Sequence, residues 1–181
     1  VSSPAAGASL GGDILRFYTD SDQLSWDVMD GYVNFISDVG FVLGLQNTRQ
    51  ALLKHDSKPV YFYLLTYTSL RAFSSFLIPM SYPKHASRFV GSGASHGDEL
   101  VHQFKTNMSQ APILPPTPDD LAFMKKFIKA WTSFAKTGNP NCEELGKTWK
   151  EDSLENPSYL ELGKEIKPVE GIVFPERMAF W

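Results

Sequence analysis

The stretch that decides the fold is Gly91-Ser-Gly-Ala-Ser-His-Gly-Asp-Glu-Leu-Val-His-Gln-Phe104. Within it His96 lies between small residues, and an acidic pair and an apolar run follow at once. Small neighbours let an imidazole reach into a cleft, and histidine is the side chain that takes up and returns a proton near neutral pH. His96 is therefore a candidate general base on a loop, and the alternative is a surface histidine in a Gly/Ser-rich loop.

The composition is that of a globular protein with a core. The chain has 181 residues, 43% apolar and 13% aromatic, which is enough for one domain. The net charge of −3 is interspersed without a basic stripe, so we expect no nucleic-acid partner. No apolar run approaches the roughly 18 residues of a membrane span, so we expect no transmembrane segment in this chain, and its first residues lack the build of a signal peptide.

Before the histidine stretch, the sequence predicts helices followed by one buried strand. Residues 1–23 are expected to be a loop, because the first dozen are rich in Ser, Ala and Gly. Helical spacing runs from Leu24 to Lys54 with an interruption at Gly40, and Ser37-Asp38 could cap the second of two helices. The run Val60–Tyr67 lacks polar alternation and predicts a strand buried on both faces. Residues 68–90, rich in proline and serine, are expected to be irregular.

From Asp98 onward, the sequence predicts more helix than strand. A short helix is expected over Asp98–Phe104, and Thr117-Pro118-Asp119-Asp120 is a strong start for a long one. Gly138 ends that helix. A short strand is expected at Tyr159–Leu162, and a helix begins at Pro175. The predicted core face of the long helix consists of Met124, Phe127, Ile128, Trp131, Phe134 and Ala135.

Three alternative sites near His96 fail, two on spacing and one on a missing residue. Gly93–Gly97 matches the G-x-S-x-G nucleophile-elbow pattern, which needs an acid and then a histidine further along the chain. The only histidine after His96 is His102, six residues on, which leaves no room for that arrangement. His96 and His102 also lack the i, i+4 spacing of a helical zinc pair, and Gly91-Ser-Gly lacks the lysine of a P-loop. We therefore expect no metal and no cofactor.

Three stretches together resemble the C-terminal part of the type-B carboxylesterase and cholinesterase family. Pro59–Tyr63 resembles its strand before the histidine loop, Gly93–Leu100 its catalytic-histidine motif, and Trp131–Asn141 its late helix and turn, which is the most specific of the three. The resemblance covers the chain from about Leu24 onward. Further likenesses are Ser37-Asp38 with Phe41, and the ending Arg177–Trp181, which resembles insect members.

The resemblance implies an α/β fold and places one catalytic residue. Residues 1–181 would be the C-terminal part of a single α/β-hydrolase domain, with a central, mostly parallel sheet flanked by helices, incomplete on its own. His96 matches the triad histidine, which would deprotonate the nucleophilic serine and later protonate the leaving alkoxide. Glu99 matches a buried carboxylate near the site and would support it without touching the substrate. Asp30 and Asp38 are poor candidates for the triad acid, which the family places further upstream.

The resulting hypothesis is a segment of a serine carboxylesterase that hydrolyses a small-molecule ester through an acyl-enzyme. Its partner would be the remainder of the esterase chain, because the nucleophile, the oxyanion loop and the triad acid all lie upstream in the family. Without them this chain alone should be inactive. One alternative is a non-catalytic cholinesterase-like adhesion or binding domain, which would lack the serine elbow. Another is an independent small domain that binds a partner.

Two further residues bear on where the protein acts. Asn107-Met-Ser109 is a sequon for N-glycosylation, which favours a secreted, extracellular glycoprotein. Cys142 is the only cysteine, so no internal disulfide can form, although it could pair with a cysteine outside this chain.

Overall fold

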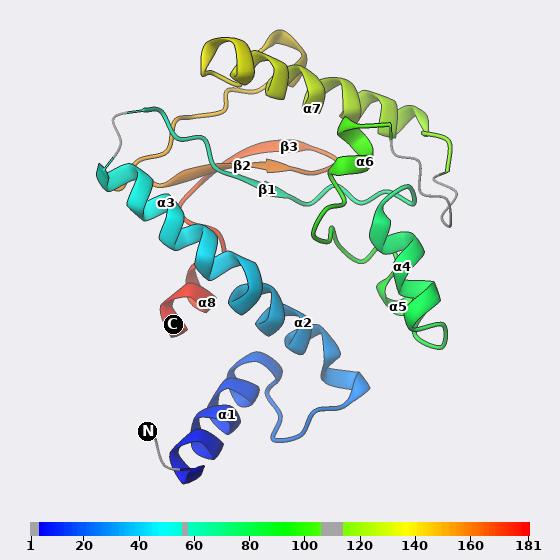
Figure 1. Cartoon of the computed structure of the whole chain (residues 1–181), viewed down its shortest axis with the longest axis vertical. Helices are drawn as coiled ribbons and strands as arrows, with labels where there is room; N and C mark the ends of the chain where they lie inside the picture. The colour runs from blue at the N-terminus through cyan, green and yellow to red at the C-terminus, as the bar shows by residue number, and fades with distance from the viewer. Residues whose placement is uncertain (1–3, 56–57, 106–113) are drawn as a thin grey trace. The chain divides into compact units, whose positions relative to one another are not determined.

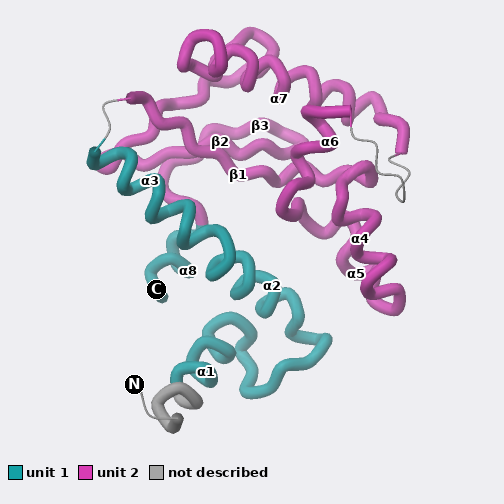
Figure 2. The backbone as a smooth tube through the Cα atoms, viewed as in Figure 1, with its two compact units in different colours: residues 1–56, 174–181 teal, residues 57–173 magenta. Residues whose placement is uncertain are grey.

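The computed structural model describes residues 4–55, 58–105 and 114–181, with side chains in the first range from Leu10 onward. The chain divides into two compact units, coloured separately in Figure 2. Unit 1 comprises residues 1–56 and 174–181, and unit 2 comprises residues 57–173. Each unit has its own set of packed elements, and unit 2 contains the sheet and the candidate site.

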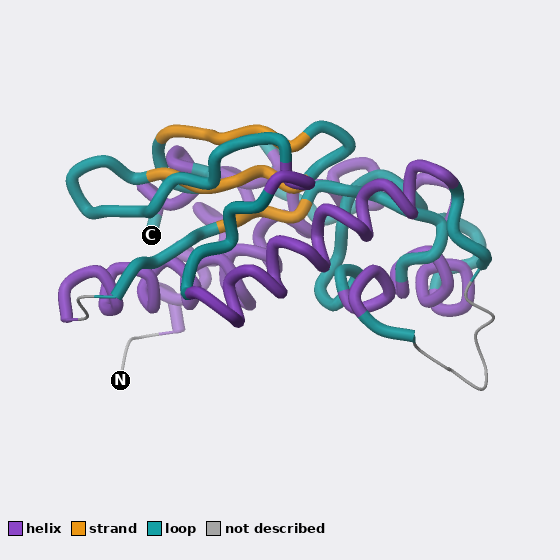
Figure 3. Tube along the Cα trace, turned by 90° about the horizontal axis from the view of Figure 1, so that it is seen from above, coloured by secondary structure: helices purple, strands orange, loops and turns teal. Residues whose placement is uncertain are grey.

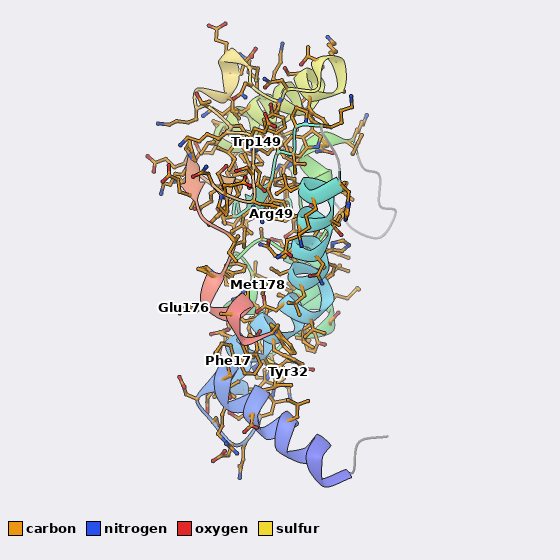
Figure 4. The ribbon with its side chains drawn as sticks, turned by 90° about the vertical axis from the view of Figure 1, so that its left-hand side faces the viewer. Phe17, Tyr32, Arg49, Trp149, Glu176 and Met178 are labelled. Atoms are coloured by element: carbon orange, nitrogen blue, oxygen red, sulfur yellow. The ribbon has the colours of Figure 1, made fainter. Side chains whose placement is uncertain are left out.

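Unit 1 is helical (Figure 1). Its helices α1 and α2 approach so closely that only glycine fits at one point of their contact. A Cβ atom on Gly31 of α2 would lie 2.0 Å from the backbone oxygen of Tyr18 in α1. Figure 4 labels Phe17 and Tyr32 in this region of aromatic side chains. The elements of unit 1 are α1 (Pro4–Thr19), the 3₁₀ turn η1 (Trp26–Val28), α2 (Met29–Ser37), the π-helical turn η2 (Asp38–Val42), α3 (Leu43–His55) and α8 (Pro175–Phe180).

The prediction of a loop over residues 1–23 is wrong, because α1 occupies Pro4–Thr19. Small residues hid a helical spacing of apolar side chains that begins at Leu10 and continues through Ile14 to Phe17 and Tyr18. Phe17 stacks on Phe180 of α8 with a centroid distance of 4.1 Å. Packing against other elements therefore stabilises a segment whose composition alone favours a loop.

The predicted helical run from Leu24 to Lys54 is confirmed, but Ser37 does not cap a second helix. Ser37 has helical backbone angles, and its hydroxyl donates to the Val33 carbonyl. The chain passes through the π-helical turn η2, which contains Gly40, and enters α3. Asp38, expected to cap that helix, is instead completely buried.

The sheet of unit 2 has three strands in the order β1-β2-β3, seen side by side in Figure 3. β1 (Tyr63–Leu65) runs parallel to β2 (Ser158–Leu162), and β3 (Ile166–Glu170) runs antiparallel to β2. The expected mostly parallel sheet is therefore a mixed one in this segment. Tyr63 is opposite Leu160, and Leu160 is opposite Pro168.

The strand predicted over Val60–Tyr67 is shorter than expected and only partly buried. β1 covers three residues, of which Tyr63 is exposed. Extended pairing continues beyond it, because Leu160 N donates to Phe62 O and Thr66 N donates to Leu162 O. Within the described residues β1 pairs with β2 alone, so the side chains of this apolar run are covered less than a central strand requires.

The long helix α7 (Pro118–Thr137) begins and ends as predicted. Thr117 and Asp120 form a reciprocal capping box, and Gly138 ends the helix with a left-handed φ of 74°. The predicted core face is partly wrong, because Ile128 and Phe134 are exposed. The apolar side chains of α7 that are fully buried in the core are Phe123, Phe127 and Ala130, of which the predicted face included only Phe127. With them the core of unit 2 consists of Tyr67, Phe123, Phe127, Ala130, Leu145, Trp149, Leu160, Leu162 and Ile166.

Residues 68–90, predicted to be irregular, contain two helices. α4 (Phe73–Ser81) includes Pro79, and α5 (Ala86–Phe89) follows it. The short helix predicted after Asp98 is present as α6 (Leu100–Gln103), and η3 (Glu143–Leu145) follows α7. The predicted strand over Tyr159–Leu162 and the predicted helix from Pro175 are both confirmed.

One helical stretch of the described residues, Trp26–His55, is long and apolar enough to cross a membrane by length and composition. Asp30, Asp38 and Arg49 divide its apolar residues, so the sequence shows no uninterrupted apolar run of that length there. Length and composition are weak evidence, since a core helix of a soluble protein satisfies the same criterion.

Candidate functional site

His96 lies at the exposed tip of a tight turn. Asp98 N donates to Ser95 O at 3.1 Å, which closes a four-residue turn with His96 as its second residue. Gly97 follows with a φ of 83°, the left-handed value that the third position of a type II turn requires and that glycine adopts without strain. The glycine after His96 is therefore explained by the backbone angle that the turn requires. The turn presents the histidine on the surface of unit 2.

Asp98 anchors this turn to α4. Its side chain is 2% exposed, and its carboxylate accepts three hydrogen bonds. Oδ1 accepts from Ser74 N at 3.0 Å, and Oδ2 accepts from Ser74 Oγ at 2.7 Å and from Ser95 N at 2.8 Å. Ser74 lies in the first turn of α4, where backbone N–H groups lack helical partners and favour a negative charge. The carboxylate thus joins the residue before His96 to the start of a helix.

Sequence reasoning missed Asp98 and chose Glu99. A signal was present, because an acid three residues after a serine can bond back to that serine's N–H, as in a capping box. Glu99 is half-buried and directly precedes α6. Its charge acts on Tyr63 of β1, where burial and, after it, the Glu99 carboxylate raise the pKa of the phenol. The predicted support of His96 by Glu99 stays a prediction.

Ser95 does not have the surroundings of a nucleophile elbow. That elbow needs a strand leading directly into the serine. The preceding strand β1 ends at Leu65, and α4 and α5 lie between it and Ser95. This arrangement agrees with the exclusion of Ser95 on spacing. Asn107, the predicted N-glycosylation residue, lies outside the described residues.

His102, the second histidine of the stretch, is a core residue. It is 1% exposed, and the rings of Tyr67 and Phe123 contact it edge-on at centroid distances of 5.4 and 5.3 Å. Burial lowers the pKa of its imidazole and outweighs the opposing charge of Asp120. His102 is therefore part of the core, whereas His96 is exposed on the surface of unit 2. In the part of the chain that the structure describes, no three His, Cys, Asp or Glu side chains gather to hold a metal ion.

A second buried carboxylate joins the end of the β1 segment to the start of α7. Tyr67 donates its hydroxyl hydrogen to Asp120 Oδ1 at 3.0 Å, and Thr117 donates from its N–H and hydroxyl to Oδ2. Burial opposes ionisation of Asp120, but the bonds from Thr117, Ser69 and Tyr67 together lower its pKa to about 2. Burial, reinforced by Asp120, raises the pKa of Tyr67.

The model of the Carboxylesterase family matches residues 5–181. The chain belongs to the carboxylesterase family. Human bile salt-activated lipase is 32% identical to this chain over 143 residues, which cover 74% of the chain and 16% of the lipase. Membership implies descent from carboxylic ester hydrolases.

Solved structures of the family show the same partial fold. A carboxylesterase of Geobacillus stearothermophilus matches with a TM-score of 0.65 at 19% identity, covering 93% of this chain and 31% of that one. The juvenile hormone esterase of Manduca sexta matches with a TM-score of 0.65 at 19% identity, covering 98% of this chain and 31% of that one. The chain therefore spans less than a third of the proteins it matches here and forms part of an α/β-hydrolase fold.

Proposed function

We propose that the chain is the C-terminal segment of a serine carboxylesterase and supplies His96 as the histidine of its catalytic triad. The observation that carries the proposal is the exposed His96 at the tip of a turn that Asp98 anchors. The Asp98 carboxylate accepts hydrogen bonds from Ser95, within the turn, and from Ser74 of α4. A general base must approach the serine hydroxyl closely and with a defined orientation. An exposed imidazole on an anchored backbone meets both requirements.

In this reaction His96 takes the proton of a serine hydroxyl as the serine attacks the ester carbonyl. It then gives the proton to the leaving alkoxide, and an acyl-enzyme remains. Water hydrolyses the acyl-enzyme with the same histidine acting first as base and then as acid. The juvenile hormone esterase of Manduca sexta was solved with OTFP covalently attached. A covalent intermediate on a serine of the full-length protein is part of the proposal, and the substrate is a small-molecule ester.

The serine, the oxyanion donors and the triad acid come, in this proposal, from the remainder of the esterase chain. Large apolar side chains of unit 1 support it: Val33, Ile36, Val39, Phe41, Leu45 and Leu52 are all exposed on α2, η2 and α3. An apolar helix surface of this extent suits packing against other elements of a hydrolase domain. That role also accounts for the apolar composition of Trp26–His55 without a membrane. Secretion and glycosylation at Asn107 belong to the same proposal.

The test compares His96→Ala with Ser95→Ala in the full-length protein. His96→Ala should lower kcat/KM for a neutral ester by several orders of magnitude, about 10³-fold or more, because one member of a cooperating triad is lost. Ser95→Ala should change it little, and an organophosphate should label a serine outside this chain. An organophosphate adduct on Ser95, or full activity of His96→Ala, would overturn the assignment. A full-length protein without any labelled serine would favour the non-catalytic binding domain.

A further inference from the structure

We infer that Asp98 is a positioning residue for catalysis: it holds the His96 turn against α4, and through that turn sets where the imidazole lies. The inference rests on the proposed role of His96 as the triad base. The role assigned to Asp98 is to anchor the backbone of the turn, and it is separate from the charge support expected of Glu99. Its evidence is the set of bonds on the two oxygens of one buried carboxylate.

The backbone around His96 needs an external anchor. Gly91 and Gly97 both have positive φ, at 78° and 83°, and Gly93 lies between them. Glycine-rich segments have more accessible backbone conformations than other segments, so a turn closed by one backbone bond is easily displaced. A displacement of about 1 Å in a catalytic group costs on the order of 100-fold in rate.

The Asp98 carboxylate provides that anchor from two directions. Oδ2 accepts from Ser95 N, in the residue before His96, while the Asp98 N–H donates to Ser95 O, so the turn is closed by two reciprocal bonds. Oδ1 accepts from Ser74 N and Oδ2 from Ser74 Oγ, which fastens the closed turn to α4. Hydrogen bonds to a charged acceptor are the stronger kind, and this carboxylate is buried.

The bonding pattern makes asparagine a specific probe. Both carboxylate oxygens accept from backbone N–H groups, so an amide in either orientation sets its NH₂ against one of those donors. Asp98→Asn therefore preserves the shape of the side chain and breaks one side of the anchor. Ser74→Ala is the milder counterpart, because it removes the Oγ bond and keeps the backbone bond.

Asp152 offers a matched control within the same unit. It is also 2% exposed, and it also accepts a hydrogen bond from a backbone N–H, that of Ser158 at 3.0 Å. Ser158 belongs to β2, so Asp152 acts in a different part of the fold from the His96 turn. Asp152→Asn likewise replaces a buried carboxylate with an amide, away from the His96 turn, and it tests whether the loss of a buried negative charge alone changes turnover.

The experiment measures kcat, KM and thermal unfolding in the full-length enzyme for Asp98→Asn, Ser74→Ala, Asp152→Asn and the double variant Ser74→Ala/Asp98→Asn. At a temperature where every variant is folded, Asp98→Asn should lower kcat by about 100-fold with KM little changed. Ser74→Ala should lower kcat by about 10-fold, the equivalent of one hydrogen bond to a charged group. The double variant should fall by less than the product of the two, since both act through one anchor. Asp152→Asn should keep the wild-type kcat.

The outcomes separate this inference from the proposed function. If His96→Ala is inactive while Asp98→Asn turns over like wild type, Asp98 does not position the base. The inference is also wrong if Asp98→Asn and Asp152→Asn lower kcat equally. If Asp98→Asn does not fold, Ser74→Ala with unchanged kcat overturns the inference. If His96→Ala keeps full activity, the proposed function itself is wrong.

Discussion

Arg177 Nη2 lies 2.9 Å from Asp38 Oδ1 and joins α8, at the end of the chain, to the π-helical turn η2 within unit 1. The Asp38 side chain is completely buried. Tyr18 of α1 donates its hydroxyl hydrogen to the other carboxylate oxygen at 2.7 Å, and Trp181 Nε1 donates to that hydroxyl oxygen at 2.9 Å. One buried anion thus holds three elements of the unit together.

Removal of the guanidinium should destabilise this unit strongly. Arg177→Ala leaves the Asp38 charge buried without its cation, which costs about 3–5 kcal/mol of unfolding free energy. Urea unfolding of the full-length protein measures the loss. The matched control is Arg16→Ala, which removes an exposed arginine paired with Asp13 and Asp22 and should change stability by no more than about 1 kcal/mol. Equal effects of the two variants would contradict a structural role for the buried pair.

Asp120 should stabilise the folded protein at neutral pH, and this stabilisation should be lost in acid. Its folded pKa of about 2 lies below the ordinary value of 3.8, so the unfolded state binds the proton more tightly. The stabilisation is present above the ordinary pKa and is lost as the pH falls from about 4 to about 2. A shift of this size corresponds to roughly 2 kcal/mol. Asp120→Asn should therefore be less stable than wild type at pH 6, and the gap should close near pH 2. Parallel stability curves for the two proteins would show that Asp120 contributes no such linkage.

Glu99→Gln should keep the fold and lower turnover of the full-length enzyme. A carboxylate near His96 would favour the imidazolium of the transition state, and the loss of one such charge costs about 3 kcal/mol at most. The assay uses a neutral ester at fixed pH, with the exposed Glu155→Gln as control. Unchanged kcat and an unchanged pH profile would remove Glu99 from the site and leave Asp98 as its supporting acid.

The isolated chain should expose apolar surface. Leu24, Val39 and Leu45 of unit 1 and Leu70 and Met80 of unit 2 are all exposed, and within the described residues β1 pairs with β2 alone. Unpaired strands and large apolar patches favour association. The 181-residue chain, expressed alone, should aggregate or bind a hydrophobic dye that the full-length protein does not bind. Cooperative unfolding of a dye-silent monomer would instead identify an autonomous domain.

Features that depend on neighbouring residues were predictable from the sequence. The capping box of Thr117 and Asp120 and the end of α7 at Gly138 are correct to the residue, because a cap bonds within one turn. β3 was missed because Lys167, Pro168 and Glu170 interrupt its apolar pattern, as an edge strand allows. The helices of residues 68–90 were missed because their serines and prolines resemble those of a loop.

The sequence by itself determined that His96 precedes a glycine suited to a type II turn, and that the chain carries the motifs of its family. Only the tertiary structure decided which carboxylate supports that turn. Asp98 and Glu99 are adjacent acids with similar chemistry, and the partner that distinguishes them, Ser74, lies 24 residues earlier in the chain. Asp38 was expected to cap a helix and is instead a buried anion for the same reason, because its partner Arg177 lies 139 residues away in the chain. Local patterns determine how a backbone turns, whereas the partner of a buried charge depends on segments that only folding brings together.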